Sequence, residues 1–228
     1  MALLLALAFV LACEDDPAAP QSNTSAYQAL TTREAVLNNL EVGWTQRNAG
    51  KIDELLDDNF TFYFSPRDVD GGLPPSWDRA SELTATAGLM TSNTSPTPRG
   101  PVCTSVHVDL DNDEVIWTEL PGPATAFGEV SYSTTVFYRF TFEMEPDMTF
   151  IAPPGAQAQF VVRQIEGGEW RLVEWYDLGN DAISAASSAA SQEKPWGSIK
   201  YLYSGKPKDE GSASGTTTWG GVKVLYRD

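Results

Sequence analysis

Residues 51–64, KIDELLDDNFTFYF, join a short amphipathic helix directly to an aromatic strand. Residues 51–58 are predicted to be a helix with one buried side, because Ile52, Leu55 and Leu56 recur at helical spacing. The run from Phe60 to Phe64 then alternates, which places its three phenylalanines on one face of a strand and Tyr63 on the other. This direct change from helical to strand period is typical of an α+β domain.

Two further helices are predicted on either side of this junction. One begins at Thr31 and carries apolar residues at helical spacing up to Trp44, and the other runs from Ser76 to Met90. The run 65–76 between the strand and the later helix is rich in proline and glycine, so it is predicted to be a loop.

Beyond Pro101 the apolar residues alternate as in strands. Strands are expected at residues 102–110, 115–120, 130–144, 158–165 and 170–178. The turn from Asp111 to Glu114 is expected to join the first two strands as a hairpin, and the turn from Glu166 to Glu169 joins the last two. Three helices followed by such strands predict an α+β fold, with the helices packed on one face of a strongly curved antiparallel sheet.

The C-terminal segment 183–228 carries a repeated motif. Residues 196–203, WGSIKYLY, recur as residues 219–226, WGGVKVLY, at a spacing of 23 residues. Residues 193–228 hold six Lys and Arg against four Asp and Glu, so this end is slightly basic. Alternation within each copy predicts one or two extra strands that complete or cover the sheet. A tail that binds a partner is the alternative.

Composition and charge bound the class of protein. The 228 residues include 31 Asp and Glu against 15 Lys and Arg, a net charge of −16, which argues against nucleic acid and an anionic membrane surface as partners. A hydrophobic content of 42% supports one medium-sized domain, placed at residues 31–182. The sequence has no Walker loop, dinucleotide fingerprint, zinc-binding cluster or nucleophile elbow, so neither a cofactor nor a metal is predicted.

The N-terminal residues have the features of a targeting signal. Met1 to Ala12 are uncharged and almost wholly apolar, and this stretch is shorter than the about 20 residues that a spanning helix needs. Residues 10–13, VLAC, resemble the lipobox of bacterial lipoproteins, in which the cysteine is acylated. We expect a signal peptide at 1–12, a lipid on Cys13, a tether at 13–30, and a protein anchored in the bacterial cell envelope that faces the periplasm or the exterior. A hydrophobic helix that stays in the protein is the alternative.

Residues 35–44, AVLNNLEVGW, and residues 53–62, DELLDDNFTF, resemble the nuclear transport factor 2-like superfamily, and its SnoaL-like bacterial branch most closely. Residues 167–175, GGEWRLVEW, are similar to the last hairpin strand of that family. The resemblance covers residues 31–178 and implies a conical pocket between three helices and a bent sheet. Members include isomerases, cyclases, dehydratases, epoxide hydrolases and binding modules without catalysis, so the resemblance implies the fold and not the activity.

An acid–base site in such a pocket needs a carboxylate and a tyrosine held by apolar surroundings. Glu174, Tyr63 and Tyr138 are the candidates, because their strands are predicted to border the pocket. Glu174 shares one face of its strand with Tyr176 and would line the pocket if that face points inward. If Trp175 points inward instead, Glu174 lies in solvent.

Aromatic residues are the remaining signal. Trp117, Phe140 and Tyr176, together with Arg163, are predicted to line a cavity for a small, mostly apolar ligand. The same rings could instead fill a core or form a homodimer through the sheet face. The single histidine and the second cysteine are not placed in the site, because alternation points His107 away from the core and buries Cys103 in a strand.

These observations predict an extracytoplasmic, lipid-anchored protein that binds a small apolar ligand or a protein partner. One alternative is a SnoaL-like isomerase, cyclase or hydrolase that uses Glu174, Tyr63 and Tyr138. Another is an interaction module that uses the open sheet face and the repeated C-terminal segments. The interior of the fold separates them: a roomy pocket with a buried carboxylate beside a tyrosine favours the enzyme, whereas a pocket filled by aromatic side chains argues against it.

Overall fold

The computed structural model describes residues 27–91, 102–121, 130–145, 148–179, 191–193 and 196–204. The predicted signal peptide, Cys13 and the second copy of the repeated motif lie outside these ranges. The helices are α1 (Arg33–Thr45), α2 (Ala49–Leu55), α3 (Pro66–Asp70), α4 (Arg79–Met90) and α5 (Trp196–Tyr203). The strands are β1 (Leu56–Tyr63), β2 (Ser76–Asp78), β3 (Val102–Leu110), β4 (Thr118–Leu120), β5 (Ser131–Glu145), β6 (Met148–Ile151), β7 (Gln157–Gln164), β8 (Trp170–Gly179) and β9 (Ser191–Glu193).

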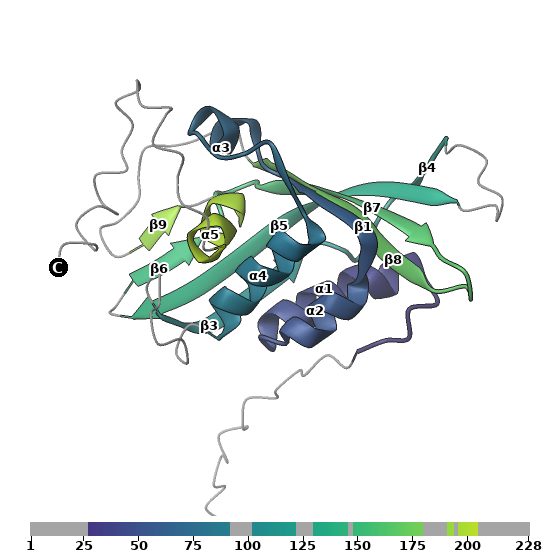
Figure 1. Ribbon diagram of the computed structural model, residues 1–228, viewed down its shortest axis with the longest axis horizontal. Coiled ribbons are helices and arrows are strands. Elements are labelled where there is room, and N and C mark those ends of the chain that lie inside the picture. The colour runs from purple at the N-terminus through teal and green to yellow at the C-terminus, as the bar shows by residue number, and fades with distance from the viewer. Residues whose placement is uncertain are drawn as a thin grey trace, which may run out of the picture.

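The strands form one curled, mixed sheet in the order β2-β1-β8-β7-β5-β6-β9. The long strand β5 organises it, because its first part pairs with β4 and β7 and its second part pairs with β3 and β6. The helices α1, α2, α4 and α5 lie on one side of this half-barrel (Figure 1). None of the described helices combines the length and the apolar character that a bilayer-spanning helix needs.

The aromatic strand behaves as its alternation predicts. Phe60, Phe62 and Phe64 are buried in the core between sheet and helices, whereas Tyr63 is half-buried on the outer face. The preceding helix, α2, ends at Leu55, because the next residue already belongs to β1. The predicted junction between helix and strand is therefore confirmed, with the helix beginning two residues and ending three residues earlier than expected.

Local capping explains two other differences. The predicted helix from Ser76 begins three residues later, because residues 76–78 pair with β1 as the short strand β2. The Asp78 side chain then caps α4 by accepting a hydrogen bond from the Ser81 amide. Within the predicted loop, the Ser65 hydroxyl accepts from the Asp68 amide and starts the five-residue helix α3.

The sheet is mixed, whereas the sequence predicted an antiparallel one. β1 runs parallel to β8, which places Tyr63 beside Tyr176, and β6 runs parallel to β9. Long stretches of chain separate the members of both pairs, so no hairpin sets their relative direction.

The hairpin expected between residues 102–110 and 115–120 does not form. β3 and β4 lie in these segments, but each pairs with β5 instead of with the other. After Leu110 the chain continues beside β5, where the Asp111 amide donates to the Phe137 carbonyl at 2.9 Å. The length of β5 lets two short strands share it.

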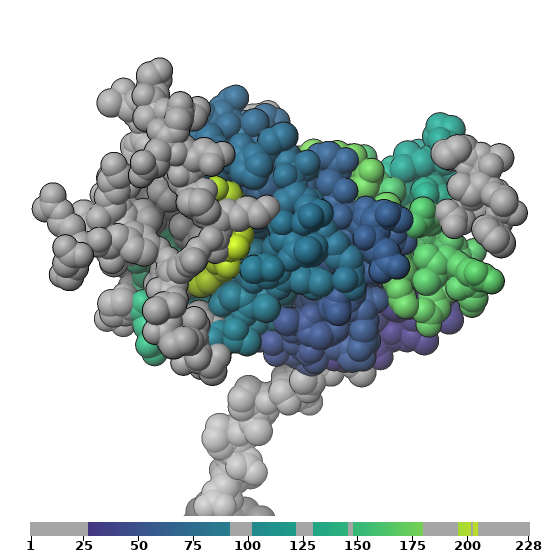
Figure 2. All heavy atoms as spheres, viewed as in Figure 1, coloured from purple at the N-terminus to yellow at the C-terminus, as the bar shows by residue number. Residues whose placement is uncertain are grey.

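The first copy of the repeated motif is the helix α5 and not the strand that alternation predicted. Trp196, Ile199, Lys200 and Tyr203 are buried, and their spacing is that of one helix face. A charged residue within this stripe conceals the helical period in the sequence. In Figure 2 the atoms of α5 (yellow) lie against those of α4, so this part of the C-terminal segment belongs to the core.

Candidate functional site

The hollow between sheet and helices, where the resemblance implies a ligand pocket, contains the side chain of Trp196 from α5. Its indole ring lies 5.0 Å from the rings of both Trp44 and Trp175, measured between centroids, and 5.1 Å from Phe140. Burying one such ring removes about 200 Å² from water, which stabilises the fold by about 5 kcal/mol. Trp196 therefore occupies the interior as a ligand would.

Lys200 enters the same interior one helical turn later. Its ammonium lies 3.6 Å from the ring centroid of Trp175 and 4.1 Å from that of Phe62, as in an aromatic cage for a cation. Glu82 of α4 supplies the counterion, with a Lys200 Nζ to Glu82 Oε1 distance of 2.6 Å, and Trp77 Nε1 donates to the second carboxylate oxygen at 3.0 Å. Both charged side chains are only 1% exposed.

Two carboxylates hold the first turn of α5. Asp177 of β8 accepts from the Tyr138 hydroxyl at 3.0 Å and from the Gly197 amide at 2.9 Å. Asp68 of α3 accepts a short hydrogen bond from the Ser198 hydroxyl. Negative charge at a helix N-terminus is favourable, because the free amides there carry partial positive charge.

Burial shifts the pKa values of these groups. It raises the pKa of Asp177, raises that of Asp68 to about 6, and raises that of Tyr138 well above its ordinary range, with the neighbouring Asp177 adding to the last effect. Burial also lowers the pKa of Lys200 to about 8, although Glu82 opposes this shift. The interior thus contains a carboxylate beside a tyrosine, but both contact α5 and are covered by it.

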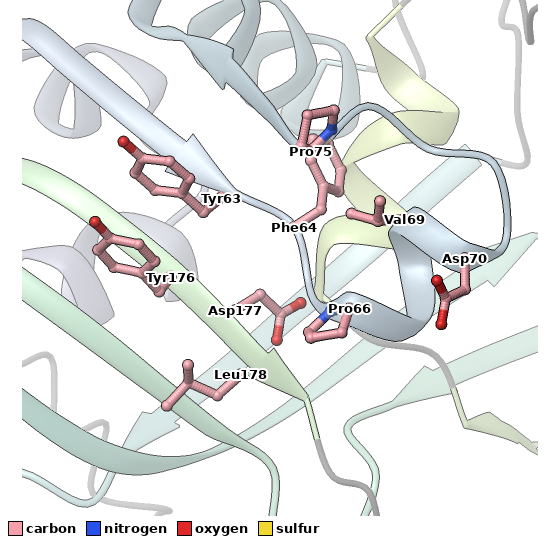
Figure 3. A pocket seen from close by; sticks show the side chains of 9 residues that line it. All are labelled: Tyr63, Phe64, Pro66, Val69, Asp70, Pro75, Tyr176, Asp177 and Leu178. Atoms are coloured by element: carbon pink, nitrogen blue, oxygen red, sulfur yellow. The ribbon is translucent and has the colours of Figure 1, made fainter.

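A second candidate site lies on the outside, where β1 and β8 meet α3. It is a pocket with a volume of about 420 Å³. The lining is mostly apolar and is drawn in Figure 3: Tyr63, Phe64, Pro66, Val69, Asp70, Pro75, Tyr176, Asp177 and Leu178. A pocket of this size and character suits a small ligand.

Two tyrosines form one wall of this outer pocket. The rings of Tyr63 and Tyr176 stack at 4.2 Å between centroids with an angle of 3°, and their hydroxyls point the same way in Figure 3. The Tyr176 hydroxyl donates to Glu174 Oε2 at 2.8 Å. Burial and this hydrogen bond raise the pKa of Tyr176, so its hydroxyl stays protonated and acts as a donor.

The structure thus brings Glu174, Tyr63 and Tyr176 together on the outer face. Tyr138 lies on the opposite, inner face, so the predicted acid–base set is not assembled in one place. The cause is a bulge in β8, where Leu172 and Glu174 pair with consecutive residues of β7. Beyond the bulge Trp175 is buried, as in the alternative that leaves Glu174 outside the interior.

The other predicted residues lie apart. Phe140 faces the interior against Trp196, as described above, and Arg163 pairs with the buried Asp57 at 2.8 Å. Trp117 is half-buried near the guanidinium of Arg33, which lies 5.6 Å from its ring centroid. Each of these three side chains therefore has neighbours within the described structure that explain its position without a ligand.

Two predictions about chemistry-bearing residues are confirmed. His107 is exposed on β3, and Cys103 is buried on the same strand. Sequence reasoning missed Asp177, Asp68 and Lys200. For Asp177 the signal was present, because it follows Trp175 at strand spacing and shares its face. Among the described residues, no group of three His, Cys, Asp or Glu side chains is arranged to hold a metal ion.

No protein-family model matches the chain, and no curated protein matches it significantly. Solved structures match in fold. A nuclear transport factor 2-like superfamily protein from Salmonella enterica serovar Typhimurium is 12% identical, covers 67% of this chain and 92% of its own, and has a TM-score of 0.45. A Novosphingobium aromaticivorans protein named as a candidate scytalone dehydratase is 11% identical, with 69% and 88% coverage and a TM-score of 0.45.

A nuclear transport factor 2-like protein of unknown function from Pseudomonas putida KT2440 is 10% identical. It covers 62% of this chain and 79% of its own, with a TM-score of 0.38. The matched structures therefore include members of the superfamily that the sequence resembles. At these identities the likeness concerns the fold and not the activity.

Proposed function

We propose that this protein is a lipid-anchored binding protein of the bacterial cell envelope that takes a small, mostly apolar ligand in its outer pocket. The observation that carries the proposal is the pocket of about 420 Å³ with the stacked Tyr63 and Tyr176 in its wall. Flat aromatic faces and prolines supply apolar contact, and a few polar groups orient a ligand. The polar side chains that line the pocket are those of Tyr63, Asp70, Tyr176 and Asp177.

The packing of the interior favours a ligand site in the outer pocket over one inside the fold. Trp196 lies where an internal ligand would lie, and the charged groups around it already pair with α5 or with each other. An internal ligand would have to displace a buried tryptophan and a buried ion pair together. The outer pocket requires no such rearrangement.

The ligand class follows from charge as well as shape. Asp70 and Glu174 stand at or beside the outer pocket, and the whole chain carries a net charge of −16. An anionic ligand would be repelled, so we expect a neutral or cationic ring-bearing molecule.

Binding is tested by saturation-transfer NMR with indole, a neutral soluble ring, on the full-length protein. Tyr176→Ala should abolish transfer to indole, because it removes one of the two stacked rings of the wall. Phe137→Ala is the matched control, since Phe137 is an aromatic side chain that is 51% exposed and does not line the pocket. Equal transfer in Tyr176→Ala and in the unsubstituted protein would refute the proposal.

The anchor rests on the apolar run Met1 to Ala12 and on Cys13 directly after it. Native mass spectrometry of the protein purified from its own envelope should show the added mass of a lipid at Cys13. The same spectrum reports a retained ligand and the number of subunits, so it also tests the homodimer predicted through the sheet face. A Cys13→Ala protein that still partitions with membranes would contradict the anchor.

A further inference from the structure

The site that holds α5 recognises a particular set of side chains. Trp196 and Lys200 fill the aromatic interior, Ile199 is buried beside them, and the Tyr203 hydroxyl lies 3.4 Å from the sulfur of Met144. These are the i, i+3, i+4 and i+7 positions by which a helix docks in a groove.

The second position of α5 must be small. A Cβ atom on Gly197 would lie 2.7 Å from a ring carbon of Phe64, closer than real Cβ contacts, and would also lie 3.0 Å from Asp68 Oδ2. Only glycine therefore lets the first turn of α5 approach α3 and the Phe64 ring this closely. The site demands Trp-Gly followed by an aliphatic residue, a lysine and a tyrosine at fixed helical spacing.

The second copy of the motif meets every one of these demands. Residues 219–226 supply the same side chains in the same register, with one aliphatic residue shortened by a methylene: Trp219, Gly220, Val222, Lys223 and Tyr226. The two copies differ at the half-buried positions of α5, where Ser198 and Tyr201 correspond to glycine and valine in the second copy. The repetition thus retains the residues that the interior contacts.

The chain between the copies allows an exchange. Fifteen residues, 204–218, separate the two motifs, and they are rich in glycine, serine and threonine. If the second copy docked, the connection from β9 would lengthen from two residues to 25. The entropy of closing a loop grows only with the logarithm of its length, so this change is tolerated.

We infer that residues 219–226 bind as a helix in the site of α5 and replace it within the same molecule. Lys223 then pairs with Glu82, and Trp219 takes the place of Trp196. α5 remains the favoured occupant, because the second copy has glycine where the Ser198 hydroxyl bonds to Asp68. This inference concerns the interior, so it goes beyond the proposed function and does not depend on the outer pocket.

A double-mutant cycle on the full-length chain tests the exchange. Trp219→Ala alone should leave the thermal midpoint unchanged, and Trp196→Ala alone should lower it by only a few degrees. The double variant should lose roughly 10 °C, because neither copy can then fill the interior. If Trp196→Ala alone falls as far as the double variant, or fails to fold, the inference is wrong.

A crosslink reports the occupant directly. Photo-methionine at Met144 should capture Tyr203 in the unsubstituted protein and Tyr226 in Trp196→Ala. Ser198→Gly is the milder second variant, and it should increase capture of Tyr226 severalfold, because it removes the Ser198 hydrogen bond to Asp68, for which the second copy has glycine. Unchanged capture in Ser198→Gly would overturn the inference, as would crosslinks to Tyr226 that form only between two differently labelled molecules.

Discussion

Replacing Asp68 with asparagine should make the stability of this protein less dependent on pH. Asp68 is only 6% exposed, and its carboxylate touches the first turn of α5 through Ser198. Burial raises its pKa from 3.8 to about 6, and the nearby Asp177 adds to the rise, whereas hydrogen bonds from Ser198 and Ser65 and the charge of Arg67 oppose it. Asparagine keeps the acceptor oxygen for Ser198 but carries no charge at any pH.

The size and sign of the effect follow from linkage. The folded protein holds the Asp68 proton more tightly than the unfolded chain, so this group stabilises the fold fully below about pH 4. That stability is lost as the pH rises through the folded pKa near 6. A difference of about two pH units corresponds to roughly 3 kcal/mol. Between pH 4 and pH 7, Asp68→Asn should therefore gain about 3 kcal/mol relative to the unsubstituted protein.

The assay is urea denaturation at intervals between pH 4 and pH 7.5, with the free energy of unfolding extrapolated to water. Asp177 titrates in the same interior, so only the difference between variant and unsubstituted protein is interpreted. Asp70→Asn is the control, because it removes an exposed carboxylate from the same helix. If the free energies of unfolding of Asp68→Asn and the unsubstituted protein differ by the same amount at pH 4 and at pH 7.5, burial does not raise the pKa of Asp68 and the reasoning is wrong.

Arg163→Ala should destabilise the fold by about 3 kcal/mol in urea denaturation, because it leaves the buried carboxylate of Asp57 without its ion pair. Arg139→Ala, which removes an 80% exposed partner, should change stability by less than about 1 kcal/mol, and equal losses would contradict the argument from burial. Thr32→Ala should cost about 1 kcal/mol by removing the N-cap of α1, with no loss if the cap is dispensable. Cys103, whose pKa burial raises to about 11, should resist a thiol reagent at pH 8 until the protein unfolds, and rapid labelling of the native protein would show otherwise.

Much of the architecture was predictable from local patterns. The alternation of Phe60, Phe62 and Phe64 identified β1 and its buried face, and β3, β5, β7 and β8 lie close to the predicted ranges. The pairing of the strands was harder to predict from the sequence, because the direction of β1 beside β8 depends on contacts across more than a hundred residues. A hairpin turn is a local feature, whereas such a pairing is not.

The candidate site divides in the same way. Tyr63, Glu174 and Tyr176 were identified from the sequence, but their meeting on the outer face depends on the bulge in β8. One extra residue in a strand moves every later side chain of that strand to the opposite face of the sheet, and no residue type in the sequence marks where this happens.

From the sequence alone it follows that helices and strands pack around one core, that the chain is strongly acidic, and that an eight-residue motif is present twice. The place of the first copy of that motif, in contrast, is visible only in the folded protein. In the sequence Lys200 has the character of a surface residue, whereas in the structure it lies between Glu82 and the rings of Trp175 and Phe62. A buried charge is stable only where a counterion and ring faces converge from separate elements, and that convergence is a property of the fold.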